Sequence, residues 1–579
     1  MPIKIYLRSF AFIVALGFFF AAPVAVSAQV CENANPQTQA DVDAFACTEV
    51  TGNIEIRDSS ISDLSGLAGL TRVGGGVAIE DNASLTNLDG LSGLTSVLYL
   101  HVYDNPALVD IGGLSGLTSA GELSLIGNGA LRNVDGLENL ASVGYFAIGG
   151  NGALENVEGL SGLREATDFV IARSDALTSL DALSGLTEVE DLTIANNAAL
   201  TSLHGLSGVT SLTSLRISEN ASLASLTGLS EDLSVWYSVT VAGNDALADL
   251  QGLERVDSLY YLTVEDNASL MRLTGLSGLR SVESEVVIAD NPVLTSLAGL
   301  SNLRQVREVT VRDNESLPSL AGPSQLEELS SLDVRRNPSL VDIGDLPALT
   351  SLFHLSLYDN DALADLDGLS NLRQLNSVTL RDNDSLKNVD GLAGISEFGR
   401  VGQTWAAVII EGNDSLQNLD GLSPAGYIRG GLVARGNTSL SSCSCGLYGK
   451  IRYGTVFGEL VVEDNAIGCK SVAEITEPGA ACPFPVESET GPDEPALLLV
   501  GPNPSRNVVV VRFDVTSPGP VRLALLDARG RAVQVLADGV MSGANEIAVE
   551  TGGWAPGVYF VRLDVIGGPS QTVPLTIVR

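Results

Sequence analysis

Short runs of alternating apolar and polar residues recur along most of the chain, and a single Asn follows each run. In residues 98–117, LYLHVYDNPALVDIGGLSGL, the apolar side chains Leu100 and Val102 precede Asn105. Alternation with a period of two predicts a short β-strand that buries one face. The second half of each repeat is short and carries a Gly eight residues past the Asn, such as Gly113. We therefore expect a return turn of extended or 3₁₀ backbone there, and not a regular α-helix.

The Asn returns at an interval of about 23 residues, a period typical of stacked repeats. The interval doubles once, where Ser174 takes the place of the Asn. Counting Ser59 as the first position, the pattern predicts 18 stacked coils. Stacked coils turn the same corner, where a buried amide can satisfy backbone groups that otherwise cost about 1–3 kcal/mol each. We expect a structural ladder of Asn82, Asn105, Asn128, Asn151, Asn197, Asn220, Asn244, Asn267, Asn291, Asn314, Asn337, Asn360 and Asn383, continued with looser spacing by Asn413, Asn437 and Asn465.

The repeat V-x-x-L-x-V-x-x-N-x-x-L-x-x-L-x-G-L resembles the leucine-rich repeat, and more closely the receptor L-domain type of bacterial surface proteins. The resemblance covers about residues 29–482 and implies a mainly β, right-handed parallel leucine-rich solenoid with Cys caps. One departure is the apolar residue after the Asn, which comes three positions later, as in Asn105 to Leu108, where common leucine-rich repeats have it two later. That spacing favours a flatter solenoid over a strongly curved horseshoe.

Residues 1–28 have the features of a secretory signal peptide, because Lys4 and Arg8 precede an apolar run that closes on AVSA. A lipid-modified Cys31 is the alternative, which Val30 disfavours because such a Cys follows a small residue. The later sequence offers no run of roughly 18 uncharged apolar residues. We expect an exported chain without a transmembrane helix.

Six cysteines form two groups, and an even count in an exported chain predicts disulfides. The groups are Cys31 and Cys47, then Cys443, Cys445, Cys469 and Cys482. A zinc site is disfavoured because only one residue separates Cys443 from Cys445 and no His is near. We expect the first pair to bond with itself, while three pairings stay open for the other four.

The formal net charge of −38 excludes some classes of partner. A surface this acidic repels DNA, RNA and anionic lipid, so we expect no nucleic-acid partner. Two explanations of the charge stay open. One is solubility in high salt, where screening removes self-repulsion, and the other is codon bias with acidic loops.

The composition changes after Cys482, where residues 483–498 predict a linker and residues 499–579 predict a small antiparallel β-sandwich. The stretches GPNPSRN, LLDARGRAV and APGVYFVRL resemble the C-terminal sorting domain of the type IX secretion system. The resemblance implies passage across the outer membrane, with the secretion machinery as partner, and then release or attachment at the cell surface. An Ig-like stalk domain is the alternative. The matching residues are Pro502, Asn503, Pro504, Gly557 and Tyr559.

Candidate catalytic chemistry is sparse. The three histidines, His101, His204 and His354, fall in distant coils, and phosphate loops, nucleophile elbows and H-E-x-x-H motifs are absent. We predict no enzyme, no cofactor and no metal site, with Ca²⁺ kept as an open possibility because oxygen ligands suit it. An Asp directly precedes the ladder Asn in several coils, although Asp is also common in turns. These residues are Asp81, Asp104, Asp266, Asp290, Asp313, Asp359, Asp382 and Asp464.

Outward-facing strand positions supply candidate binding residues, because Arg and Tyr are enriched at recognition hot spots. One column, two residues before the Asn, holds Arg312, Arg335, Tyr358 and Arg381 in four successive coils. Alternatively, these Arg side chains only neutralise the Asp residues beside them. A smaller aromatic patch combines Tyr99, His101 and Tyr103. Trp236 falls on an apolar position of the pattern and is expected in the core.

The sequence therefore predicts a secreted, surface-displayed, non-catalytic protein that recognises a protein or glycan in an adhesion-type role. A passive rod or spacer of the cell surface is the second hypothesis, and an enzyme is the third.

Overall fold

The computed structural model describes residues 29–57, 60–400, 406–443, 447, 450–451, 454–476, 498–501, 508–527, 531–551, 553–565 and 570–577. Several sequence predictions lie outside these ranges: the signal peptide 1–28, Ser59, Cys445, Cys482, nearly all of the linker 483–498, and Pro502, Asn503 and Pro504. The chain divides into two compact units, Met1–Cys482 and Pro483–Arg579. Within the described ranges, no helix is both long enough and apolar enough to cross a membrane.

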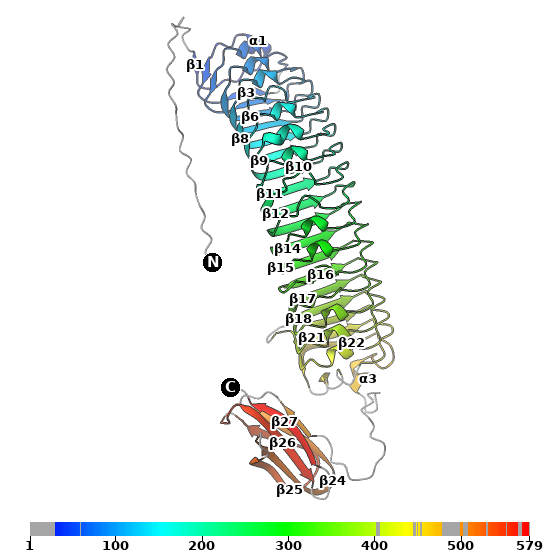
Figure 1. Ribbon diagram of the computed structural model, residues 1–579. Coiled ribbons are helices and arrows are strands. Elements are labelled where there is room, and N and C mark those ends of the chain that lie inside the picture. Colours follow the sequence, from blue (N-terminus) through cyan, green and yellow to red (C-terminus); the bar gives the residue numbers. More distant parts are fainter. Residues whose placement is uncertain are drawn as a thin grey trace. The chain divides into compact units, whose positions relative to one another are not determined.

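The first unit is a stack of coils whose strands form one continuous parallel sheet along one side (Figure 1). Successive strands pair in register, for example Leu100 with Leu123 and Val102 with Leu125, and these apolar side chains are buried. The predicted mainly β, parallel solenoid is confirmed. Its strands are β3 (Ile54–Arg57), β5 (Val77–Glu80), β6 (Ser96–Tyr103), β7 (Ser119–Ile126), β8 (Ser142–Gly149), β9 (Glu165–Ala172), β10 (Glu188–Ala195), β11 (Ser211–Ser218), β12 (Ser234–Ala242), β13 (Ser258–Glu265), β14 (Ser281–Ala289), β15 (Gln305–Arg312), β16 (Ser331–Arg335), β17 (Ser351–Tyr358), β18 (Gln374–Arg381), β19 (Glu397–Phe398), β20 (Val408–Glu411), β21 (Tyr427–Arg435) and β22 (Val456–Glu463).

The return half of the coils contains 3₁₀ turns, because the segments there are too short for an α-helix. Most of them end in a buried Leu. Each coil must also approach the next closely, and the Gly in these turns allows it. These turns are η1 (Ser65–Leu67), η2 (Asp89–Leu91), η3 (Gly112–Leu114), η4 (Glu158–Leu160), η5 (Asp181–Gly185), η6 (His204–Leu206), η7 (Thr274–Leu276), η8 (Ala298–Leu300), η9 (Asp367–Leu369), η10 (Asp390–Leu392) and η11 (Asp420–Leu422).

The ladder Asn side chains line a buried seam between the sheet and the return turns. Asn105 shows the pattern: its Oδ1 accepts hydrogen bonds from the N–H and Nδ2 of Asn82, both at 3.0 Å. Its own Nδ2 donates to Ile79 O at 3.0 Å and Tyr103 O at 2.9 Å. Each amide thus joins consecutive coils. The described ladder positions run from Asn82 to Asn465, with Ser174 among them, and number 17.

The residue before each described ladder position has a left-handed backbone, with φ between 51° and 73°. Asp, Asn and Gly tolerate this conformation better than other residues, which gives the repeated Asp a conformational cause. The residues with this backbone include all eight Asp residues that the sequence analysis considered as calcium ligands, from Asp81 to Asp464. They also include glycines such as Gly127 and Gly150.

Both ends of the solenoid are closed by disulfides and short helices. At the N-terminal end, Cys31 bonds Cys47 beside α1 (Gln39–Asp43) and the small sheet of β1 (Val30–Cys31), β2 (Glu49–Val50) and β4 (Arg72–Val73).

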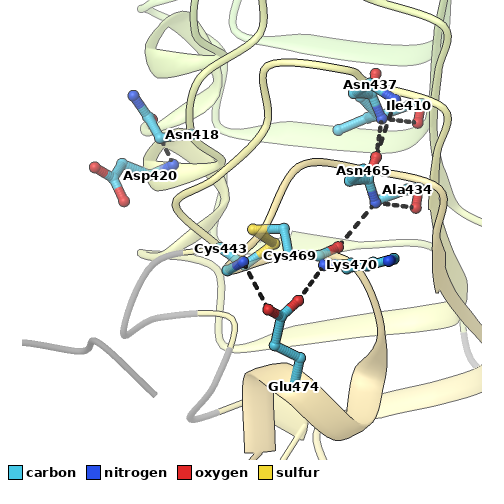
Figure 2. The surroundings of a disulfide bond; sticks show 11 residues. Ile410, Asn418, Asp420, Ala434, Asn437, Cys443, Asn465, Cys469, Lys470 and Glu474 are labelled. Carbon is cyan, nitrogen blue, oxygen red and sulfur yellow. Dashed lines mark hydrogen bonds between the residues drawn. A yellow bond between two sulfur atoms is a disulfide. The ribbon is translucent and has the colours of Figure 1, made fainter. Parts of the chain in front are cut away.

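At the C-terminal end, Cys443 bonds Cys469, the pairing among the four later cysteines that lies within the described residues (Figure 2). Helix α3 (Val472–Thr476) adjoins this bond, and its Glu474 accepts hydrogen bonds from the backbone N–H of Gly468 and Lys470. These contacts hold the last coil, so that its edge is covered.

The second unit is an antiparallel sheet with its own core. Its strands are β23 (Leu498–Gly501), β24 (Val508–Leu526), β25 (Ala532–Glu550), β26 (Gly557–Val565) and β27 (Ser570–Ile577). Alternate residues of β24, including Val511 and Leu523, are fully buried against Val561 and Leu563 of β26. Tyr559 donates a hydrogen bond to Ala555 O at 3.0 Å, and its ring lies 5.4 Å from that of Trp554.

Candidate binding face

The outward face of the solenoid sheet holds the arginine–tyrosine stripe, defined as Arg312, Arg335, Tyr358 and Arg381. Strand register places these four side chains next to one another across β15 to β18. The neighbouring column of Thr310, Asp333, Ser356 and Thr379 runs in parallel beside it. Parallel strands about 4.8 Å apart therefore hold the stripe at fixed spacing.

Carboxylates engage the two ends of this stripe. Arg312 lies 3.4 Å from Glu265 and 3.2 Å from Asp313, and it also pairs with Asp290. Arg381 pairs with Glu411. The arginines at the ends therefore neutralise nearby carboxylates. Arg312 does so with the adjacent Asp313, as the alternative interpretation of the sequence holds, whereas the partner of Arg381 is a Glu in the next coil.

Arg335, at the centre of the stripe, makes a longer ion pair than the arginines at the two ends. The Arg335 side chain is 40% exposed, and its nearest carboxylate is Asp333 at 3.7 Å. Tyr358 is its register partner on β17. Arg335 and Tyr358 together present a cation and an aromatic ring to solvent, and they are the members of the stripe best placed to contact a ligand.

The smaller patch of Tyr99, His101 and Tyr103 is a stack on β6. The His101 ring lies 4.7 Å from that of Tyr99 and 5.0 Å from that of Tyr103, the latter at an angle of 10°. Burial raises the pKa of the Tyr103 hydroxyl. His101 Nε2 lies 2.9 Å from Glu122 Oε1, a close contact without hydrogen-bond alignment. The three side chains form one rigid surface feature.

Trp236 does not lie in the core, and the sequence prediction for it was wrong. Its side chain is 63% exposed. The coil from Asn220 to Asn244 is one residue longer than the coil before it, and the extra residue forms a bulge in β12: Leu212 pairs with Val235, but Ser214 pairs with Ser238. Val235 thus takes the buried position, and Trp236 points outward.

The bulge creates an aromatic cluster that sequence analysis missed, made of Trp236, Tyr237, Tyr260 and Tyr261. Tyr237 stacks on Tyr260 with ring centroids 5.6 Å apart and an interplanar angle of 17°. Trp236 and Tyr261 stand edge-on to Tyr237, at 66° and 84°. The signal in the sequence was the adjacent pairs WY and YY in successive strands, one of them in a lengthened coil.

The row of Asp residues lines a shallow groove of about 660 Å³ beside the stripe, because Asp290 and Asp313 of the groove also pair with Arg312. Asp266, Asp290, Asp313 and Asp359 lie along it. Arg336 reaches into the row and donates to both oxygens of Asp313 at 2.6 and 2.7 Å. These hydrogen bonds are the main cause that lowers the pKa of the Asp313 carboxyl.

The part of the chain that the structure describes contains no group of three or more His, Cys, Asp or Glu side chains that could hold a metal ion. The expectation of no metal site, with Ca²⁺ kept as an open possibility, stays a prediction.

The three histidines lie in separate elements, His101 on β6, His204 in η6 and His354 on β17. His354 Nδ1 shares a hydrogen bond with Ser377 Oγ, and burial lowers the pKa of its imidazole. His101 and His354 are thus explained by their own local contacts.

Comparisons with known proteins bear mainly on the second unit. The family model described as "Secretion system C-terminal sorting domain" matches residues 500–573. A search of solved structures found a leucine-rich repeat protein from Bacteroides ovatus, 16% identical, covering 53% of this chain and 82% of that chain with a TM-score of 0.17. At that score the match adds nothing to the architecture described above. No curated protein matched.

The matched segment contains β24, β25 and β26, together with Gly557 and Tyr559, which the sequence named as sorting-domain residues. Such domains mark proteins that are secreted and displayed on the cell surface, so the secretion machinery is a partner of this chain. The chain therefore carries a type IX secretion C-terminal sorting domain that follows a parallel leucine-rich β-solenoid in the sequence, and it is a secreted protein of the cell surface.

Proposed function

We propose that the solenoid is a non-catalytic binding surface that recognises a glycan or protein in an adhesion-type role at the cell surface. The observation that carries this proposal is the half-buried register pair of Arg335 and Tyr358 at the centre of the stripe, where Arg335 has only a long ion pair of 3.7 Å. Strands β15 to β18 pair in continuous register and fix these side chains before a ligand arrives, which reduces the entropy lost on binding.

A passive spacer of the cell surface is the second candidate, and an enzyme is the third. A spacer needs solubility and length, and it gains nothing from outward aromatic rings. The exposed rings on β12 and β13 thus favour the binder, because water-exposed aromatic surface costs solubility unless a ligand covers it.

The double substitution Arg335→Glu with Tyr358→Ala tests the proposal. We expect at least a tenfold loss of adhesion to whichever member of a glycan and cell-surface protein panel the wild-type chain binds, because both hot-spot side chains are removed. Binding is measured on immobilised panel members, and the melting temperature verifies the fold.

The matched control is Arg132→Glu with Phe457→Ala, which makes the same charge change and also removes one exposed ring. It should bind like the wild type. Equal loss in both variants would attribute binding to net charge, and no loss in the stripe variant would refute the site.

A further inference from the structure

The aromatic cluster of Trp236, Tyr237, Tyr260 and Tyr261 is a feature that the stripe does not use. Trp236 is 63% exposed, Tyr237 40% and Tyr261 37%. Large aromatic side chains bury a large area when a ligand covers them. Three of them in one exposed patch therefore indicate a binding surface.

The cluster is held rigidly. Tyr237 contacts Tyr260 and Tyr261 at 5.6 and 5.8 Å, and Tyr260 lies 4.8 Å from Tyr261. The bulge in β12 fixes the direction of Trp236, since Val235 directly before it and Val239 three residues after it are buried in the core. The rings therefore keep their arrangement without a ligand.

The two strands that carry the rings hold little charge, although Glu285 on β14 pairs in register with Tyr261 and Arg216 on β11 pairs in register with Thr240. Strand β12, SVWYSVTVA, contains no charged residue, and β13, SLYYLTVE, has only Glu265 at its end. Half-buried hydroxyl groups flank the rings, at Ser238, Thr240 and Thr263. In the described residues, the Tyr237, Tyr260 and Tyr261 hydroxyls have no hydrogen-bond partner within the protein.

We infer that the aromatic cluster binds a neutral glycan, an inference that rests on the proposed function and names its ligand class. The C–H face of a sugar ring is weakly positive and packs on the negative face of an aromatic ring, while sugar hydroxyls bond to Ser, Thr and Tyr hydroxyls. Strands β12 and β13 themselves carry Glu265 as their one charged residue and so offer a charged ligand few ion pairs, and a net charge of −38 repels anionic glycans.

The size of the patch also favours a glycan over a protein. A stable protein interface buries on the order of 800 Å² on each partner and centres on a mixed apolar core. Four rings on two strands offer less than that, whereas one or two rings are enough to stack a sugar unit.

The experiment uses the mature full chain and insoluble chitin, cellulose and starch as neutral probes, with polygalacturonate as an anionic and poly-lysine as a cationic probe. We expect retention on at least one neutral probe, equally at low and high salt, because neutral ligands lack the charge that salt screens. Trp236→Ala with Tyr237→Ala should lower this retention at least tenfold. Trp236→Phe, which keeps a ring, should stay within about threefold of the wild type.

Phe457→Ala is the control, since it removes an exposed ring from β22 in another coil and should leave retention unchanged. The inference is overturned if no neutral probe retains the wild type, if the double variant binds as well as the wild type, or if only poly-lysine binding depends on the cluster. Should the cluster variant bind normally while Arg335→Glu with Tyr358→Ala does not, the proposed function stands and the glycan site fails.

Discussion

Replacing Asn291 by Ala is expected to lower the free energy of unfolding of the solenoid by about 3–5 kcal/mol. Asn291 is fully buried, and its Oδ1 accepts from the N–H and Nδ2 of Asn267 at 3.1 and 3.2 Å. Its Nδ2 donates to Val264 O at 3.0 Å and Ala289 O at 2.7 Å. Alanine leaves at least one buried N–H and two buried carbonyls without this partner, and each costs about 1–3 kcal/mol. Urea denaturation followed by circular dichroism measures the change.

Ser174 supplies the matched control, because it is the described ladder position without an amide. Its hydroxyl donates to Ala172 O at 3.4 Å, and its own N–H donates to Asn197 Oδ1 at 3.1 Å. An Asn at this position would offer the same kind of acceptor to the N–H of Asn151 in the coil before it. Ser174→Asn should therefore stabilise the solenoid by about 1 kcal/mol. If Asn291→Ala and Ser174→Asn both leave the unfolding midpoint unchanged, the amides do not join the coils energetically.

The solenoid was predictable because one repeat unit determines both the local structure and its packing. The alternation at Leu100 and Val102 determines the buried strand face, and the nearly constant length of the repeat places each strand in register with the next. The same pattern recurs in each coil and supports the same structure each time. The ladder Asn is predictable because every coil must satisfy the same buried backbone groups.

Features that depend on a departure from the repeat could not be predicted. Counting from Asn244 puts Trp236 on a buried position, and only the bulge between Val235 and Ser238 reverses this. The sequence shows that the coil is lengthened by one residue, but not where the chain places the extra one. The aromatic cluster was missed for that reason.

The sequence correctly placed the four residues of the stripe next to one another, but it did not predict which carboxylates pair with the arginines. The partners of Arg312 include Glu265, two coils away, and Asp290, one coil away. Side-chain reach across coils determines these pairs, and sequence spacing alone does not resolve it. The consequence is functional: Arg335 is left as the arginine of the stripe with the longest ion pair, at 3.7 Å from Asp333.

Gly275→Ala is expected to destabilise the solenoid by about 3 kcal/mol or more, a loss comparable to that of the ladder amide. A Cβ at Gly275 would lie 1.7 Å from Leu250 O and 2.2 Å from Leu250 C, both backbone atoms of the previous coil. No side-chain rotation relieves this overlap, so the coils must separate and the buried Leu276 must lose packing. Thermal unfolding measures the loss.

Gly152→Ala is the control for this substitution, because a Cβ there meets nothing within 4 Å. Ala83 and Ala268 already occupy the same position after other ladder residues, so the backbone there accepts a side chain. The midpoint of Gly152→Ala should fall at or slightly above that of the wild type, since Ala restricts the unfolded chain more than Gly does. Equal midpoints for the two variants would show that the coils are not in close backbone contact at the return turn.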